Sequence, residues 1–301
     1  MKRSAIALAI LIINISAFFG IALSQNNRDQ KAWDRMFREL PMTAVINVNI
    51  ADLYREPSAR SERVSQALYN EVVEILEEER RYAWIKQADD YEGWVRKVFL
   101  TEHNDFTGDG PFVVVSNLAP VFTGPDNNSG RITSLPYGCE LFGKLGANFL
   151  QVVTDRYGEI YIGLNDIQRK DSSFLSVVTD SAALCHEGEK FFGAPYLWGG
   201  RSFYGIDCSG FTQIILKRFG IDLPRDSKDQ IKVGIEVKRD NIRAGDLLFF
   251  PRHVTLAVSK DLMIHSTGSN GGVAYNSLDP DHPRYSKYHD ENFIAARRVV
   301  K

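Results

Sequence analysis

The sequence predicts a multidomain protein in which two small all-β barrels precede an α+β domain. Three observations lead to this prediction. Short strand-like runs separated by polar turns fill residues 42–170, their pattern occurs twice, and from about residue 174 a helical pattern is followed by further strands. Short, evenly spaced strands are typical of small barrels, and helices followed by an antiparallel group of strands are typical of α+β folds. The 301 residues are enough for two or three domains.

Residues 1–24 have the pattern of a signal peptide. Lys2 and Arg3 provide a positive start, and an apolar run from Ala5 to Leu23 ends in small residues at the spacing of a cleavage site. The run approaches the length of a membrane span, so an uncleaved anchor is the alternative. We expect an exported protein, periplasmic or secreted, without stable membrane association after signal removal. Residues 25–41 are expected to form a charged helical segment.

Residues 42–103 carry the first predicted barrel. Apolar and polar residues alternate along its strand-like runs, and Pro57 marks a turn. The predicted strands are Val45–Ile50, Val72–Leu76, Tyr82–Lys86 and Glu92–Val95.

Residues 110–170 repeat this plan more loosely as a second predicted barrel. Both segments close with a polar turn, an aromatic residue, a glycine and a strand, in Asp90–Val95 and in Asp155–Ile162. We interpret the segments as tandem copies of one unit. The predicted strands of the second copy are Phe112–Val115, Val121–Phe122, Cys139–Lys144, Phe149–Val153 and Gly158–Ile162.

Residues 174–301 form the predicted α+β domain. Its first helix is expected over Ala182–Phe192. A second helix has one apolar face, because apolar residues recur at i, i+3, i+4 and i+8 from Phe211, and Gly220 is expected at its C′ position. Antiparallel strands are predicted over Asp246–Phe250, Val254–Ser259, Leu262–His265, Val273–Asn276 and Phe293–Val300.

The seam between a glycine-rich loop and this second helix holds Cys208. A helix start favours negative charge, so we expect a thiol that ionises easily. His253 and His265 follow in strand-like settings, and a turn near Lys260–Asp261 would place them on neighbouring strands. His253 could then take the thiol proton, and His265 could orient His253 as the carboxylate does in a serine triad.

Other interpretations of these residues remain open. A buried cysteine and two satisfied histidines would need no catalytic role. A zinc site is disfavoured because the chain has neither a C-x-x-C nor an H-x-x-x-H pair, so no metal or cofactor is expected. Cys139 and Cys185 are interpreted as buried thiols, with a disulfide as the alternative. The net charge of -2 gives no reason to expect a nucleic-acid partner.

The motifs YLWGG, DCSGF, PRDS, GDLLFF, the HV of RHV, and MIHS resemble those of the NlpC-type cell-wall cysteine peptidases. The resemblance covers about residues 174–301 and implies a papain-like fold. The two preceding segments resemble bacterial SH3-like domains. Together they resemble the γ-D-glutamyl-L-diamino acid peptidases, also called dipeptidyl-peptidase VI, which cut peptidoglycan stem peptides after L-Ala-γ-D-Glu. The chain departs from the family at Thr255, where glycine is common, and we expect a local packing change there.

The resemblance implies a Cys-His-His triad and an acyl-enzyme. Cys208 matches the nucleophile, His253 the base and His265 the third polar residue. Tyr196 matches the tyrosine whose hydroxyl helps bind the oxyanion, and the backbone N–H of Cys208 is a second possible donor. A packing role for Tyr196 is the alternative.

The resemblance also implies a pocket for a free N-terminal L-Ala and the γ-linked D-Glu. Asp226 and Ser227 match residues that meet the free amine, and Glu56 and Tyr91 resemble partners supplied by the first barrel. Arg225 and Ser209 could bind the α-carboxylate, while Asp207 could line the pocket or cap the helix. The candidate substrate-binding residues are Asp226, Ser227, Glu56, Tyr91, Arg225, Ser209, Asp207 and Trp198.

Four functions follow as alternatives. The preferred one is an exported, monomeric peptidase acting on peptidoglycan-derived peptides, in which the second barrel braces the other domains. The second is an endopeptidase or amidase on intact peptidoglycan, with the barrels as wall-binding modules. The third is a catalytically idle wall-binding protein. The fourth is an acyltransferase or amidase on the same fold. The residues do not distinguish L-Lys from diaminopimelate at the third stem position.

Overall fold

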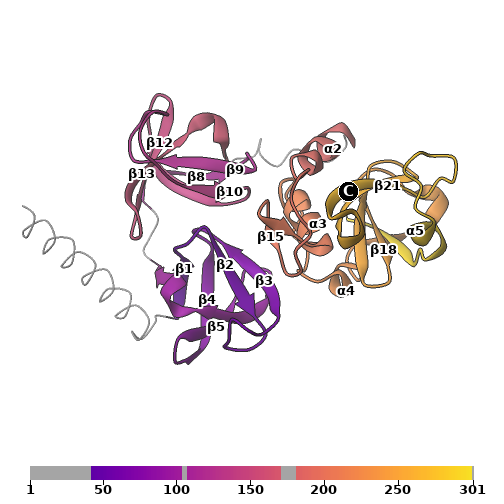
Figure 1. The fold of residues 1–301 in the computed structure, drawn as a ribbon, viewed down its shortest axis with the longest axis horizontal. Coiled ribbons are helices and arrows are strands. Elements are labelled where there is room, and N and C mark those ends of the chain that lie inside the picture. The colour runs from indigo at the N-terminus through magenta and orange to yellow at the C-terminus, as the bar shows by residue number, and fades with distance from the viewer. Residues whose placement is uncertain (1–41, 104–106, 171–180, 300–301) are drawn as a thin grey trace, which may run out of the picture.

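The computed structural model describes residues 42–103, 107–170 and 181–299. The expected signal peptide, the helical segment over 25–41 and the start of the last domain at 174 lie outside these residues. Figure 1 shows two all-β regions beside a larger domain in which helices and a sheet are combined. Among the described residues, no helix has the length and apolarity needed to cross a membrane.

The first β region is an antiparallel sheet in the order β3-β2-β6-β5-β4-β1-β7. Its apolar core includes Leu53, Ile85 and Val95, which alternate with more exposed neighbours along their strands. Its elements are β1 (Thr43–Ile46), β2 (Ile50–Tyr54), β3 (Arg63–Leu68), β4 (Val72–Glu79), β5 (Tyr82–Lys86), β6 (Glu92–Arg96), a 3-10 turn (Lys97–Phe99) and β7 (Leu100–Glu102).

One predicted strand of this region is wrong, because the run Val45–Ile50 is divided between β1 and β2. At the division, the backbone N–H of Asn47 donates to the carbonyl of Phe99 at 2.9 Å, and its side chain donates to the carbonyl of Leu100 at 3.2 Å. These bonds draw Asn47 toward β7. The chain then turns so that β1 pairs with β4 and β7, whereas β2 pairs with β3 and β6.

The second β region has the strand order β10-β9-β13-β12-β11-β8-β14, which is the order of the first region with each strand number raised by seven. β3 and β10 occupy corresponding places, and neither was predicted. The elements are β8 (Asp109–Val114), β9 (Leu118–Phe122), β10 (Arg131–Pro136), β11 (Glu140–Leu145), β12 (Phe149–Thr154), β13 (Gly158–Gly163), a 3-10 turn (Leu164–Asp166) and β14 (Ile167–Arg169).

The two β regions contact each other through asparagine side chains of the first. Asn49 donates to the hydroxyl of Thr133 and to the carbonyl of Ser134, and Asn70 donates to the carbonyl of Glu140 at 3.0 Å.

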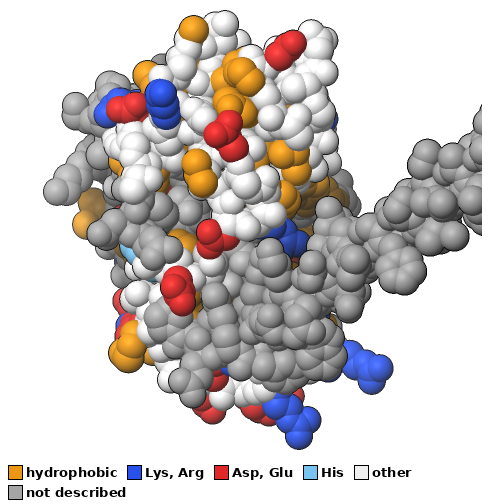
Figure 2. Space-filling model, turned by 90° about the vertical axis from the view of Figure 1, so that its left-hand side faces the viewer, with side chains coloured by type: hydrophobic (Ala, Val, Ile, Leu, Met, Phe, Trp, Pro, Cys, Tyr) orange, Lys and Arg blue, Asp and Glu red, His pale blue; other side chains and the backbone are white. Residues whose placement is uncertain are grey.

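Figure 2 shows one face of the molecule, on which acidic, basic and hydrophobic side chains of the described residues are interspersed.

The last domain has a six-stranded antiparallel sheet in the order β17-β22-β18-β19-β20-β21 and a separate two-stranded sheet of β15 and β16. The predicted meander is present as β18 to β21, and the final strand returns to lie between β17 and β18. The strands are β15 (Arg201–Ser202), β16 (Gly205–Ile206), β17 (Ile235–Val237), β18 (Asp246–Phe250), β19 (His253–Ala257), β20 (Leu262–Thr267), β21 (Gly272–Ser277) and β22 (Ala295–Arg298).

Helices α2 and α3 lie on the side of the six-stranded sheet that faces the β regions, whereas α5 lies at the far end of the domain (Figure 1). The apolar face of α3 packs against β19 and β20. Gly220 has a φ of +75° two residues beyond the C-cap Arg218, so α3 ends slightly earlier than predicted. The helices are α2 (Ser181–Glu189), α3 (Cys208–Lys217), α4 (Ser227–Gln230) and α5 (Lys287–Glu291), with 3-10 turns at Arg239–Asn241 and Gly268–Asn270.

Thr255 and the cysteines bear on two further expectations. Thr255 is buried in β19, and its hydroxyl lies 3.3 Å from the sulfur of Met263 on β20, so the departure from the family pattern fits a local polar contact. No disulfide joins Cys139 and Cys185, which excludes the disulfide alternative in this structure; Cys139 is buried as expected, whereas Cys185 is half-buried.

Candidate active site

Cys208 is the first residue of α3, and the preceding Asp207 caps the helix. The Asp207 carboxylate accepts hydrogen bonds from the N–H groups of Gly210 at 2.7 Å and of Gly199 at 2.9 Å. The glycine-rich loop passes very close to other backbone, because a Cβ on Gly200 would lie 2.3 Å from the carbonyl oxygen of Gly205. Glycine there lets the loop approach closely enough to fix the start of α3.

Arg225 is fully buried behind the same cap. Its guanidinium donates to both carboxylate oxygens of Asp207, at 2.7 and 3.0 Å, and to the Ser209 hydroxyl at 2.9 Å. It also donates to the hydroxyl of Ser65 in the first β region at 3.1 Å. Arg225 therefore neutralises the buried Asp207, and the expectation that it binds a substrate carboxylate is corrected: its N–H groups are engaged inside the protein.

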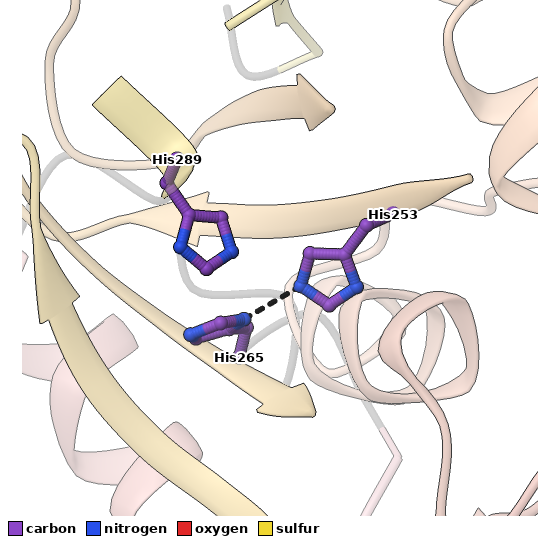
Figure 3. A group of neighbouring side chains, drawn as sticks. All are labelled: His253, His265 and His289. Carbon is purple, nitrogen blue, oxygen red and sulfur yellow. Dashed lines mark hydrogen bonds between the residues drawn. The ribbon is translucent and has the colours of Figure 1, made fainter. Parts of the chain in front are cut away.

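His253 and His265 lie on the paired strands β19 and β20, as the predicted turn requires. His253 Nε2 and His265 Nδ1 are 2.6 Å apart, and His265 Nε2 is 2.9 Å from Oδ1 of Asn276 (Figure 3 shows the first contact). The Asn276 amide is oriented by two more bonds, because Asn270 donates to its oxygen and its nitrogen donates to the carbonyl of Arg284.

This chain of bonds sets the ring tautomers. The oxygen of Asn276 accepts, so His265 donates from Nε2 and presents a lone pair at Nδ1. His253 then donates from Nε2 and keeps the lone pair of its Nδ1 free. That nitrogen can serve as a base.

Burial keeps these groups neutral. It lowers the pKa of His253 to about 4, with His289 contributing, and holds the pKa of His265 well below its usual value. Burial, followed by the charge of Asp207, raises the pKa of the Cys208 thiol to about 11. The expectation of an easily ionised thiol is therefore wrong for the unliganded site, because desolvation outweighs the effect of the helix start.

Cys208 and His253 line one cavity of about 400 Å³. Several other predicted site residues share it, namely Asp207, Ser209, Asp226, Ser227, Tyr91 and Trp198. Arg55, Glu62, Lys228 and Arg252 supply further charge to its wall. Glu56 is exposed and is not among the lining residues.

The first β region forms part of the cavity wall. Tyr91 interacts with the carboxylate of Asp226, and burial followed by that charge raises the pKa of Tyr91 to about 12. Glu62 accepts a hydrogen bond from the indole of Trp198 at 2.9 Å and is paired with Arg55 at 2.8 Å. Glu62, rather than the predicted Glu56, is thus the glutamate that this region brings to the cavity.

Tyr196 lies near the nucleophile. Burial, followed by the charge of Cys208, raises the pKa of its hydroxyl to about 12, so the hydroxyl stays protonated and can donate a hydrogen bond. Its backbone N–H donates to the carbonyl of Gly271 at 3.1 Å, which ties the YLWGG loop to the start of β21.

Three site residues were missed by the sequence analysis. Glu62 and Asn276 lie in ordinary polar strand or turn contexts, and His289 lies in the short helix α5. His289 is placed so that one nitrogen from each of His253, His265 and His289 lies within 4.8 Å of the others (Figure 3). No spacing in the sequence indicates this cluster, because its members come from two strands and a helix.

Two family models match the chain. One is described as the NlpC/P60 family and matches residues 193–296, and the other is described as the bacterial dipeptidyl-peptidase SH3 domain and matches residues 53–98. The first match contains Cys208, His253 and His265, and the second contains Glu62 and Tyr91.

Curated relatives match over long stretches. Dipeptidyl-peptidase 6 of Lysinibacillus sphaericus is 29% identical over 81% of this chain and 94% of its own length. A γ-D-glutamyl-L-lysine dipeptidyl-peptidase of Bacillus cereus is 27% identical over 78% of this chain and 75% of its own length. The probable endopeptidase NlpC of Escherichia coli is 34% identical over 40% of this chain and 80% of its own length.

Among solved structures, an NlpC/P60 family protein from Bacillus cereus superposes with a TM-score of 0.74 at 23% identity. The alignment covers 86% of this chain and all of that structure. The overall arrangement of this chain therefore has a counterpart in an experimentally determined fold.

Proposed function

This chain belongs to the NlpC/P60 family, and from that premise we propose that it is an exported cysteine peptidase that cleaves the γ-D-Glu–L-diamino acid bond of peptidoglycan-derived peptides. One observation carries the proposal: Cys208 and His253 share a cavity whose wall includes residues of the first β region. Relatives named as dipeptidyl-peptidases match across both parts.

The hydrogen-bond chain supports His253 as the base. Its Nδ1 takes the thiol proton of Cys208 as the sulfur attacks the carbonyl carbon of the scissile amide. The resulting imidazolium donates from Nε2 to His265, whose orientation is held by Asn276. His253 then delivers the proton to the leaving amine, and a thioester with Cys208 remains until water hydrolyses it.

The oxyanion of each tetrahedral intermediate needs donors near the sulfur. The protonated hydroxyl of Tyr196 and the backbone N–H of Cys208, at the start of α3, are the two groups that we assign to this role. Neutral starting groups suit this scheme, because the proton moves only when the substrate is in place.

The wall of the cavity supports recognition of a free N-terminal amine. Asp226 and Glu62 are the carboxylates of the wall outside the helix cap, and Tyr91 and Ser227 add hydroxyls. A cation that leaves water for such a pocket needs acidic or polar partners. We assign Asp226, Ser227 and Tyr91 to the amine, whereas the exposed Glu56 receives no role.

Because Arg225 is engaged inside the protein, the carboxylate of a γ-linked D-Glu residue must be bound by other hydrogen-bond donors. Ser209 lines the cavity but already accepts from Arg225 and donates to Asp207 at 3.3 Å, so it can help only by exchanging the latter bond. Trp198 supplies an exposed aromatic wall beside Glu62.

The organisation proposed with this function is a signal peptide over 1–24, a helical segment over 25–41, SH3-like barrels over 42–103 and 110–170, and a peptidase domain over 174–301. The shared strand order of the two β regions supports the assignment of the second barrel. Relatives that are cell-wall peptidases support an extracellular or periplasmic location. We propose that the mature protein is a monomer.

The test is hydrolysis of L-Ala-γ-D-Glu-L-Lys and of its N-acetyl form, with Cys208→Ala as the inactive control. Release of L-Ala-γ-D-Glu from the free-amine peptide alone is the expected result. Equal cleavage of both peptides would favour an endopeptidase. Cleavage of neither peptide, together with release of fragments from intact peptidoglycan, would contradict the dipeptidyl-peptidase assignment.

A further inference from the structure

A third histidine adjoins the proposed catalytic pair, and the hydrolytic scheme does not use it. The ring centroid of His289 lies 5.1 Å from that of His265 and 5.6 Å from that of His253. The three rings turn one nitrogen each toward a common point (Figure 3). His289 is 6% exposed, and its ring packs edge-on against Phe250 with the ring centroids 4.7 Å apart.

The outward nitrogens of two rings already have partners. His265 Nε2 donates to Asn276, and His289 Nδ1 lies 2.7 Å from the hydroxyl of Ser286. The inward nitrogens are therefore Nδ1 of His265 and Nε2 of His289, which face Nε2 of His253. Metal-binding histidines are commonly held in this way, with the second nitrogen bonded to an oxygen of the protein.

We propose that His253, His265 and His289 form a binding site for a divalent transition metal, with Zn²⁺ the best fit, and that the bound metal inhibits the enzyme. Three imidazole nitrogens and a water molecule are a usual zinc environment. With bonds of about 2.1 Å, two ligand nitrogens lie roughly 3.4 Å apart in a tetrahedral site. Nε2 of His253 and Nδ1 of His265 are 2.6 Å apart, so these two nitrogens must separate by roughly 0.8 Å when a metal binds.

Inhibition follows from the position of the proton on the His253 ring. The metal needs the lone pair of His253 Nε2, so the single proton of that neutral ring moves to Nδ1. Nδ1 is the nitrogen that takes the thiol proton in the proposed mechanism, and once protonated it can no longer do so. No proton leaves the cluster when His265 and His289 carry theirs on the outward nitrogens, where Asn276 and the Ser286 hydroxyl can accept a hydrogen bond from each.

The cavity offers the metal a path to the site. His253 lines the cavity, and the buried rings of His265 and His289 adjoin His253. Soft and borderline metals that prefer imidazole should bind, and Mg²⁺ should not, because it prefers oxygen ligands and keeps its water.

The first experiment measures hydrolysis of the free-amine tripeptide against ZnCl₂ in a non-chelating buffer. Zinc should inhibit the wild-type protein, an excess of chelator should restore activity, and Mg²⁺ should have no effect. His289→Gln and His289→Phe should need about tenfold or more zinc for half inhibition, measured against each variant's own activity without zinc. Unchanged zinc sensitivity in both variants, or an uninhibited wild type, overturns the proposal.

The inhibition assay rests on the proposed hydrolytic activity. A binding experiment does not, so it tests the metal site separately from the proposed function. Calorimetric titration with ZnCl₂ should show one site in Cys208→Ala and none in Cys208→Ala/His289→Gln. Loss of binding in Cys208→Ala alone would indicate a site formed by the thiolate and His253, and would overturn the proposal. If both His289 variants fail to fold, Ser286→Ala keeps the test, since loss of this outer partner should weaken zinc binding about tenfold.

Discussion

The two β regions share one strand order but have different relations to the candidate site. The first region places Arg55, Glu62 and Tyr91 in the wall of the cavity. The second region contacts the last domain at α2 and at the end of α3, where Tyr137 donates to Glu187 and Arg218 donates to Gln168. The two equivalent sheets therefore contribute differently to the site through their loops and edges, since loops vary more freely than the strands that carry them.

The contacts of the first region also reach the interior of the last domain. Gln66 accepts from the backbone N–H of Arg201 at 2.9 Å, and Asp89 accepts from Gln213 of α3 at 2.7 Å. The second region shares an apolar cluster with the last domain, which includes Tyr137, Phe191 and Phe211 and to which the first region adds only Leu68 and Tyr69 as buried members. We therefore expect changes at the first interface to alter the site, and changes at the second to alter stability alone.

The largest effect is expected from Arg225→Met. The change leaves the buried Asp207 carboxylate unpaired and removes the bond to Ser65 of the first region, so the free energy of unfolding should fall by about 3–5 kcal/mol. Urea denaturation of the purified variant measures this. Lys170→Gln, which breaks a more exposed pair with Glu140 in the second region, is the control and should cost about 0–1 kcal/mol. Similar losses of unfolding free energy in Arg225→Met and Lys170→Gln would contradict the expected difference between the two regions.

A smaller effect is expected from Tyr91→Phe. Loss of the hydroxyl next to Asp226 should raise KM for the free-amine tripeptide about tenfold, with a much smaller change in kcat. Steady-state kinetics measures both constants. Tyr161→Phe in the second region, where the hydroxyl bonds Glu159, should leave both unchanged. An unaltered KM in Tyr91→Phe would remove this tyrosine from the substrate site.

Tyr137→Phe tests the second interface. The hydroxyl is buried and bonds Glu187 at 2.8 Å, while Lys190 remains to pair with that carboxylate. We expect a loss of about 1 kcal/mol in the free energy of unfolding and unchanged hydrolysis at 25 °C. A fall in kcat in a variant that is still folded would show that the second region also influences the chemistry.

The smallest effect concerns pH. The pKa of His253 is lowered to about 4, so the neutral base is present above that pH and is lost as pH falls through it. The acid limb of kcat/KM should therefore lie near pH 4, well below the ordinary histidine value. Glu62→Gln should not move this limb, because the lowered pKa of His253 arises from burial and His289, with Asp207 acting in the opposite direction. An acid limb near pH 6.5 would show that His253 is solvated in the working enzyme.

The same lowered pKa values affect stability. His253 and His289 are neutral when folded at pH values where the unfolded chain would bind protons. Stability is therefore complete above about pH 6.5 and declines as pH falls toward 4. The pH–rate measurements should accordingly be accompanied by circular dichroism to show that the protein remains folded.

The strength of the sequence signal explains which elements were predicted. Tyr82–Lys86 and Asp246–Phe250 have clear alternation or continuous apolar runs, and the structure has strands with those bounds. β3 and β10 were missed because Arg63–Leu68 and Arg131–Pro136 mix polar residues on both faces. Polar residues in β3 are buried only because the last domain covers it, as the contacts of Ser65 and Gln66 show.

Local sequence patterns were enough to predict the order of the domains, the helix that begins at Cys208 and the pairing of His253 with His265. These features depend on local periodicity, capping and a short turn between neighbouring strands. Long-range packing was needed to show that Arg225 neutralises Asp207, that Glu62 rather than Glu56 reaches the cavity, and that His289 joins the other histidines. Each of these contacts joins segments distant along the chain, and burial, which sets the pKa values of Cys208 and His253, depends on how all the segments pack.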